Sequence, residues 1–352
     1  MSLATFWLAL LGLLLAGYFV LGGYDYGVQM LHPFLSDRKD PRPAPRSASG
    51  PPEPRSAPRN PALDAIAPFF LGNEVWLVAF TGVLFGAFPH LEGTLLSGLY
   101  PLIVAILVGL VLGNAAVQLR GRARGARGRR WWNALIVFGG VLPALCWGLV
   151  VGLLLHGVPR RADGSFHIGF GEVFTPFVLA CGVTAVLLFA AHGAAFVALR
   201  AAPEIAAEAG RLGAFLLAAT GAAGALALLL TLFGAGASTT NPGVAAVLAA
   251  VFAAALGAGR WCLARGHRIP AFALTSCAAA LPVPLLGAGQ YPYVLISSAG
   301  SGLTIQEAVT DGTTLKLLTA FGVVLIPVIL AYQAWSWWEF RGRTGLRHPS
   351  YF

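Results

Sequence analysis

Few side chains that could do chemistry lie inside the long apolar segments of this chain, and Asp25 is the clearest of them. The stretch GGYDYGVQMLHPFL, residues 22–35, places this carboxylate near the end of the first apolar run, beside tyrosines and paired glycines. An ionisable group at membrane depth is costly unless it is paired or hydrated, so it is a functional candidate. Asp25 is either a proton-relay or buried interface carboxylate, or an acid near the membrane surface held by a hydroxyl or backbone donor.

The start of the second apolar run, LGNEVWLVAF at residues 71–80, holds three further candidates, Asn73, Glu74 and Trp76. On one interpretation, Asn73 caps a helix and Glu74 in the first turn complements the positive end of the helix dipole. Trp76 would then suit the aromatic belt at a membrane surface. On the other interpretation, Glu74 is an intramembrane acid with a functional role.

Metal-binding patterns are absent from the sequence. It contains no C-x-x-C, no C-x-x-C-H for covalent haem and no pair of histidines four residues apart, so no metal site is predicted. Isolated histidines such as His32, His156 and His192 remain weaker candidates for axial haem ligands. The four cysteines lie inside apolar runs and are expected to be small core residues.

Composition places the chain in a membrane. Of its 352 residues, 57% are hydrophobic and 11% are charged, and the mean hydropathy is +0.75. A soluble protein of this length could not bury so much apolar surface. Windows of about 20 apolar residues, long enough to cross about 30 Å of hydrocarbon, predict an all-α polytopic protein with its termini on opposite sides. The nine predicted helices lie near residues 5–34, 72–90, 94–119, 133–157, 173–199, 211–234, 243–264, 269–289 and 314–338.

Basic residues give the expected orientation, because Lys and Arg stay on the cytoplasmic side of short loops. With the N-terminus outside and the C-terminus cytoplasmic, 20 of the 23 Lys and Arg residues fall on the cytoplasmic side. The exceptions are Arg160, Arg161 and Lys316. The net charge of +9 therefore indicates topology anchors beside anionic lipid, such as RGRARGARGRR at residues 120–130, and not a nucleic-acid site.

We expect residues 1–352 to form a single integral membrane domain. One segment stands apart: residues 36–63 are rich in Pro, Arg, Ser and Gly and nearly lack apolar side chains. Such a segment cannot bury enough surface to fold. It is predicted to be a flexible cytoplasmic loop insertion, whereas the other loops are short and favour antiparallel neighbouring helices.

Two smaller patterns concern helix packing and helix ends. Glycines four residues apart on apolar helices allow two backbones to approach closely. Such pairs are Gly82 and Gly86, Gly109 and Gly113, and Gly148 and Gly152. Residues 290–321 form a polar connection into the last helix, where Thr310, Asp311, Thr313 and Thr314 are candidate capping residues.

Several short motifs, taken in order, resemble subunit II of the cytochrome bd quinol oxidases over nearly the whole chain. They are GGYDYGVQML, IAPFFLGNEVWLVAFTGVLFGAFP at 66–89, LYPLIVAILVGLVLGNAAVQLR at 99–120, PFVLACGV and HGAAFVALR in the fifth helix, and YPYVLIS, TLKLLT and PVILAYQAW near the end. Each motif is weak alone, and together they are specific.

The resemblance implies a complex in a bacterial-type cytoplasmic (inner) membrane that oxidises quinol and reduces oxygen to water. Subunit I carries two b-type haems, haem d and the quinol site. Subunit II consists of two four-helix bundles plus one helix, binds no haem itself and stabilises subunit I. In the family it can also contribute to oxygen or proton access and hold a structural quinone, and a small accessory subunit can join the complex.

Asp25, Asn73, Glu74 and Trp76 match the family pattern, but three usually charged family positions do not. The family has a Trp-Asp pair before GNEVW, where this chain has Phe70 and Leu71, and the acid is assigned to a proton path. In the third helix an Arg and an acid are replaced by Gly113 and Gln118. Leu71 cannot bind or release a proton, so protons are expected to pass Asp25 or Glu74, or the complex works differently.

The alternative function is a proton-coupled secondary transporter in which Asp25 and Glu74 bind the coupling ion. Such transporters usually show paired broken helices in corresponding halves of the sequence. No such pairing is visible here, which favours the oxidase subunit.

Overall fold

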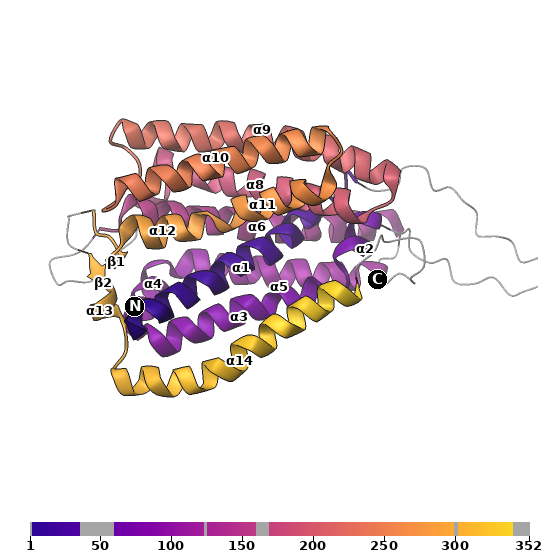
Figure 1. Cartoon of the computed structure of the whole chain (residues 1–352). Helices are drawn as coiled ribbons and strands as arrows, with labels where there is room; N and C mark the ends of the chain where they lie inside the picture. The colour runs from indigo at the N-terminus through magenta and orange to yellow at the C-terminus, as the bar shows by residue number, and fades with distance from the viewer. Residues whose placement is uncertain (1, 36–59, 123–124, 160–168, 299–301, 341–352) are drawn as a thin grey trace, which may run out of the picture.

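The computed structural model describes residues 2–35, 60–122, 125–159, 169–298 and 302–340. Within these ranges the chain is a bundle of long helices, in which the start of α1 and the end of α14 lie at opposite ends of the bundle (Figure 1). Nine helices of the described part are long and apolar enough to cross a membrane, which confirms the predicted all-α polytopic class. Eight of the nine are single helices: α1 (Leu3–Leu31), α3 (Phe70–Ala87), α5 (Tyr100–Leu119), α6 (Gly125–His156), α8 (Pro176–Arg200), α9 (Pro203–Leu232), α10 (Pro242–Ala264) and α14 (Gly312–Glu339).

The remaining span is divided. It consists of α11 (Arg268–Ala280) and α12 (Pro282–Gln290), joined at Leu281. Proline lacks the backbone N–H that an unbroken helix would use and its ring crowds the preceding turn, so Pro282 starts a new helix instead of continuing the first. The prediction of one helix over 269–289 located the span but not this division.

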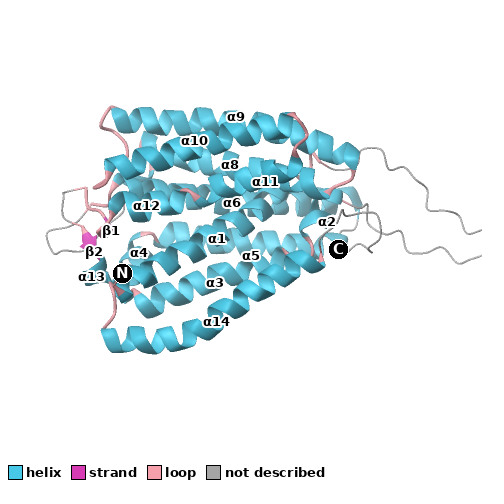
Figure 2. Cartoon of the chain, viewed as in Figure 1, coloured by secondary structure: helices cyan, strands magenta, loops and turns pink. Residues whose placement is uncertain are grey.

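The short elements lie at the two ends of the bundle (Figure 2). At the end where α14 finishes is α2; at the other end lie α4, α13 and the antiparallel strands β1 and β2. Their bounds, with the two remaining short helices, are α2 (Pro61–Ile66), α4 (Pro89–Gly98), η1 (Arg120–Arg122), α7 (Phe170–Val173), β1 (Tyr293–Leu295), β2 (Leu303–Thr304) and α13 (Ile305–Ala308).

Helix contacts divide the molecule into two groups. In the first half, α1 packs against α3 and α6, and α5 packs against α6; in the second half, α8, α9, α10 and α11 pack in sequence around one another. Helices α6 and α1 of the first group both pack against α8 of the second, and α14 packs against α3 on the outside (Figure 1). This arrangement is compatible with two four-helix bundles plus one helix.

Two predicted boundaries differ from the structure. Asn60 caps α2 by accepting from the backbone of Ala62 and Leu63, so residues 60–63 belong to a capped helix and not to a loop. Residues 36–59 of the predicted insertion lie outside the described residues. Helix α6 begins at Gly125, within the arginine-rich segment, because a helix can continue beyond the hydrocarbon while its arginines reach headgroups or water.

Glycines allow the closest helix contacts, but not always at the predicted pairs. A Cβ on Gly27 of α1 would lie 1.9 Å from the carbonyl oxygen of Phe189, beside Gly193 of α8. A Cβ on Gly113 of α5 would lie 2.8 Å from the Cα of Gly139 in α6. In contrast, a Cβ on Gly82 would meet nothing within 4 Å. Close backbone approach therefore holds α1 to α8 and α5 to α6.

Candidate functional site

Asp25 lies in the core where α1 meets α3, and 4% of its surface is exposed. Its Oδ2 accepts a hydrogen bond of 2.8 Å from Nδ2 of Asn73. Its Oδ1 is buried and has no hydrogen-bond partner among the described residues. Only Oδ2 of the carboxyl is thus hydrogen-bonded, and its donor is an uncharged amide.

Asn73 is the organising side chain of this site, and the prediction that it caps a helix is wrong. Helix α3 begins at Phe70, one turn earlier, so Asn73 lies inside the helix and faces α1. Its Nδ2 also approaches the hydroxyl of Tyr24 at 2.8 Å and the carbonyl of Leu21 at 3.4 Å. Because three acceptors of α1 surround it, Asn73 fixes the pairing of the two helices.

Glu74 and Trp76 point to different neighbours. Glu74 is half-buried, and its Oε1 accepts from Nδ2 of Asn114 on α5 at 3.3 Å. Trp76 donates from Nε1 to Oε1 of Gln333 on α14 at 3.1 Å, and its ring fills the space left by Gly17. The expectation of an interfacial belt position for Trp76 is wrong, since the ring is buried between α1 and α14.

Aromatic rings enclose the site on the α8 side, a feature that the sequence did not reveal. Tyr24 stacks on Phe196 with ring centroids 4.2 Å apart. His192, also on α8, lies inside the helix and is fully buried. Its Nε2 bonds the carbonyl of Val20 at 3.0 Å and its Nδ1 bonds Thr275 at 2.9 Å. Periodicity alone could not show that these residues meet.

The three positions that depart from the family pattern are also placed by the structure. Leu71 is 60% exposed on the outside of α3, whereas Gly113 is buried against α1 and α6. Gln118 is exposed near the end of α5. A Cβ on Gly113 would lie 2.7 Å from Oε1 of Gln29, so the side chain of Gln29 occupies the space that a larger residue at 113 would need.

The buried histidines do not fit haem. Axial ligation needs a free imidazole nitrogen facing a cavity large enough for the macrocycle, and both ring nitrogens of His192 are already bonded. His32 bonds the carbonyl of Gln29 through Nδ1. Its side chain is also fully buried, and a haem-sized cavity would leave its ring exposed. Among the described residues, no three His, Cys, Asp or Glu side chains gather as a metal site would require.

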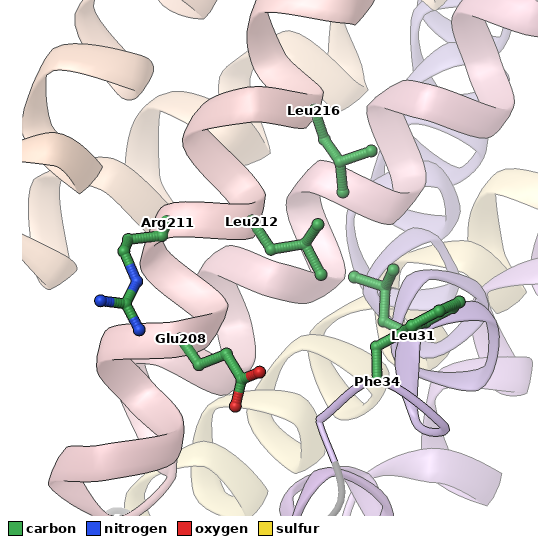
Figure 3. Close-up of a pocket in the computed structure, with 6 residues that line it drawn as sticks. All are labelled: Leu31, Phe34, Glu208, Arg211, Leu212 and Leu216. Carbon is green, nitrogen blue, oxygen red and sulfur yellow. The ribbon is translucent and has the colours of Figure 1, made fainter.

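A separate groove lies between the end of α1 and α9 (Figure 3). Leu31 and Phe34 line one side, and Glu208, Arg211, Leu212 and Leu216 line the other. None of Asp25, Asn73, Glu74 and Trp76 contributes to this groove. The candidate site is therefore an enclosed polar centre and not an open pocket.

The model of one protein family, described as cytochrome bd terminal oxidase subunit II, matches residues 3–340 of this chain. The chain belongs to this family. Two relatives agree in length as well. The cytochrome bd ubiquinol oxidase subunit 2 of Bacillus subtilis (strain 168) is 28% identical over 360 residues, which cover 99% of this chain and 98% of the relative. The cytochrome bd-I ubiquinol oxidase subunit 2 of Escherichia coli (strain K12) is 27% identical over 381 residues, covering 96% and 94%.

A solved structure of bd oxidase, from Geobacillus thermodenitrificans, has the same fold as this subunit II chain. The TM-score is 0.69 at 18% sequence identity, with 97% of this chain and 99% of the other chain covered. The family model and the two relatives confirm the resemblance inferred from the motifs. The chain is subunit II of a bd-type quinol oxidase complex with a subunit I partner, and the transporter alternative is not favoured.

Proposed function

We propose that this chain is a haem-free companion subunit that stabilises a haem-bearing subunit I and supplies a buried polar centre for proton passage. The observation that carries the proposal is the position of Asp25, enclosed between α1 and α3. One carboxylate oxygen is bonded to Asn73, and the other has no hydrogen-bond partner among the described residues. A carboxyl kept in the core without a counter-charge is costly, so it is expected to serve function and not stability.

The chemistry of the histidines supports placing the two b-type haems and haem d in the partner. His192 uses both ring nitrogens for bonds to Val20 and Thr275, and a haem would have to break one of them. Quinol oxidation and oxygen reduction then take place in subunit I, and no electron passes through this chain. A structural quinone and a small accessory subunit also belong to this proposal, by analogy with the family.

The distribution of charge supports an orientation in the bacterial cytoplasmic membrane. The end of the bundle that holds α2 and the end of α14 (Figure 1) also holds Arg120, Arg200 and Arg211. Because basic residues remain on the cytoplasmic side, we place this end in the cytoplasm and the N-terminus outside. Asp25 is then reached by protons from the cytoplasmic side.

Glu74 is the second candidate for proton passage. It follows Asn73 directly on α3 and meets Asn114 of α5, so it lies near Asp25 but outside the enclosed centre. Leu71, in contrast, faces away from the bundle and carries no ionisable group. We assign the route to Asp25 and Glu74 and none of it to Leu71.

Purification tests the haem-free assignment. The chain expressed alone is expected to show no haem absorbance. The complex of this chain with subunit I is expected to show the full haem absorbance of the oxidase. As a control for misfolding, the isolated chain should retain the helical circular dichroism of the nine spans. Stoichiometric haem in the isolated, folded chain would contradict the proposal.

A further inference from the structure

The groove between the end of α1 and α9, which we call the α1–α9 groove, has a volume of about 510 Å³. Pockets of this size hold small molecules in other proteins. Three of the side chains that line it, Phe34, Glu208 and Arg211, are exposed, so the groove opens to the surroundings of the bundle. For a chain that spans a membrane, these surroundings are lipid headgroups and hydrocarbon.

The packing of the helices produces this groove. Helices α1 and α9 both pack against α8, whereas the main contacts of α9 are with α8 and α10 and not with α1. Leu31 and Phe34, at the end of α1, therefore lie across the groove from Leu212 and Leu216 of α9 (Figure 3). The apolar walls of the groove come from two helices that α8 holds side by side.

The lining of the groove changes from charged to apolar along α9. This helix starts at Pro203, at the end of the bundle that holds α2. Glu208 and Arg211 come first, and Leu216 lies about 12 Å further along the helix than Glu208, at about 1.5 Å per residue. Figure 3 shows the same order, with Glu208 and Leu216 at opposite ends of the groove. A lipid leaflet changes in the same direction, from charged headgroups to hydrocarbon.

Glu208 and Arg211 carry opposite charges three residues apart, so their side chains lie on neighbouring parts of the helix surface. Neither side chain forms a hydrogen bond or a salt bridge within the described part of the chain. The carboxylate and the guanidinium are therefore both available to a ligand that carries a positive and a negative group close together.

We propose that the α1–α9 groove binds one membrane phospholipid whose headgroup carries a phosphate and a primary ammonium, as in phosphatidylethanolamine. The guanidinium of Arg211 donates hydrogen bonds to the phosphate oxygens. The ammonium donates to the carboxylate of Glu208. The start of one acyl chain lies along Leu212 and Leu216, and Phe34 covers it from the side of α1. The rest of the lipid remains in the surrounding leaflet.

The charges in the groove select among headgroups. Phosphatidylglycerol carries the phosphate without an ammonium, so Glu208 has no positive partner and repels the phosphate. Phosphatidylcholine carries both charges, but its quaternary nitrogen has no N–H group to donate to Glu208. A quinone carries no charge and would use neither Glu208 nor Arg211. Phosphatidylethanolamine should therefore bind best, phosphatidylcholine next and phosphatidylglycerol least.

Lipid retention by the assembled complex of both subunits tests this inference. The delipidated complex in detergent is mixed with equal amounts of the three phospholipids with identical acyl chains, and retained lipids are counted by native mass spectrometry. The wild type is expected to retain phosphatidylethanolamine preferentially. Glu208→Lys is expected to shift the ratio of bound lipid toward phosphatidylglycerol by about tenfold, because it places a second cation beside the phosphate.

Glu204→Lys is the matched control. Glu204 is an exposed acid on the same helix that does not line the groove, so this variant should bind the three lipids as the wild type does. Equal shifts in the two lysine variants would assign the preference to overall surface charge and overturn the proposal. Should Glu208→Lys not assemble, Glu208→Gln decides: it should reduce the preference for phosphatidylethanolamine over phosphatidylglycerol, and an unchanged preference would overturn the site.

Filling the groove provides a second test. Leu212→Trp is expected to remove one retained phosphatidylethanolamine per complex, and an unchanged number would show that the lipid binds elsewhere. Loss of a bound quinone instead of a phospholipid in this variant would overturn the choice of occupant. The inference does not depend on the role of Asp25, so its failure would leave the proposed function standing.

Discussion

Asn73 and Asp25 join α3 to α1 through a hydrogen bond of 2.8 Å in the buried centre of the molecule. The bond connects residues that are 48 positions apart in sequence, and it uses the amide nitrogen whose other neighbours are Tyr24 and Leu21. One amide thus holds a carboxyl, a phenol and a helix carbonyl in place. The function and the packing of this region depend on the same side chain.

Asp25 is expected to matter more for turnover than the position where the family has an acid. Asp25→Asn should lower quinol oxidase turnover by about tenfold, equivalent to about 1.4 kcal/mol of activation free energy. Leu71→Ala should change turnover little, because Leu71 is exposed and not ionisable. Turnover and haem content are measured in the same preparations. Equal turnover of wild type and Asp25→Asn, with intact assembly, would remove Asp25 from the proton route.

Removal of the amide at 73 should destabilise the complex. Asn73→Leu removes the donor to Oδ2 of Asp25 and to the hydroxyl of Tyr24. An unsatisfied buried polar group costs about 1–3 kcal/mol. The thermal midpoint of the purified complex should fall. In a double-mutant cycle, the cost of Asn73→Leu should be smaller when Asp25 is already alanine. Additive effects would show that the hydrogen bond does not couple the two helices.

The contact between α1 and α8 should tolerate no side chain at Gly27. Gly27→Ala would place a Cβ 1.9 Å from the carbonyl oxygen of Phe189, which is backbone and cannot move aside alone. We expect a loss of at least about 3 kcal/mol of stability, at the upper end of overpacking effects, seen as poor assembly or a lower thermal midpoint. Gly82→Ala is the matched control, since its Cβ meets nothing within 4 Å. It should be neutral or stabilise α3 by up to about 1 kcal/mol.

Acid should loosen the start of α14 before the rest of the helix. The hydroxyl of Thr314 and the backbone N–H groups of Thr313 and Thr314 donate to Asp311 and hold the pKa of its carboxyl below the ordinary value. A lowered native pKa means that the cap contributes stability above the unfolded-state pKa, and that this stability is lost as the pH falls through the native value.

Hydrogen exchange checks this cap. The amides of Thr313 and Thr314 should exchange faster as the pH falls through the acid range than intrinsic exchange predicts, and Asp311→Asn should remove most of that pH dependence. Amides near Gln333, in the same helix, serve as an internal reference. An unchanged profile in Asp311→Asn would assign the effect to another group.

The number and order of the spans followed from the sequence, because a membrane imposes its length on every helix that crosses it. Apolar windows of sufficient length therefore marked all nine spans found in the described residues, and the ordered motifs marked the family. Asp311 as a helix cap was also predictable, since a capping side chain bonds residues two or three positions away. Each of these features depends on neighbours along the chain.

The site itself was only partly predictable. Asp25 and Glu74 stood out because charge is rare in apolar runs, but one of the two interpretations made Asn73 a cap and Trp76 an interfacial residue. Both are instead turned inward, Asn73 to Asp25 and Trp76 to Gln333. Helical periodicity gives the face on which a side chain lies and not the helix that this face meets.

The sequence by itself determined that this chain spans a membrane with helices, that its basic residues gather toward one side and that Asp25 is an ionisable group in an apolar run. The tertiary structure decided that Asp25 is buried and which groups surround it. Asn73 comes from α3, and the ring of Phe196 that stacks on Tyr24 comes from α8. The glycines that lie against Gln29 come from α5 and α6. Helix partners are selected by packing between surfaces distant in sequence, which no local pattern records.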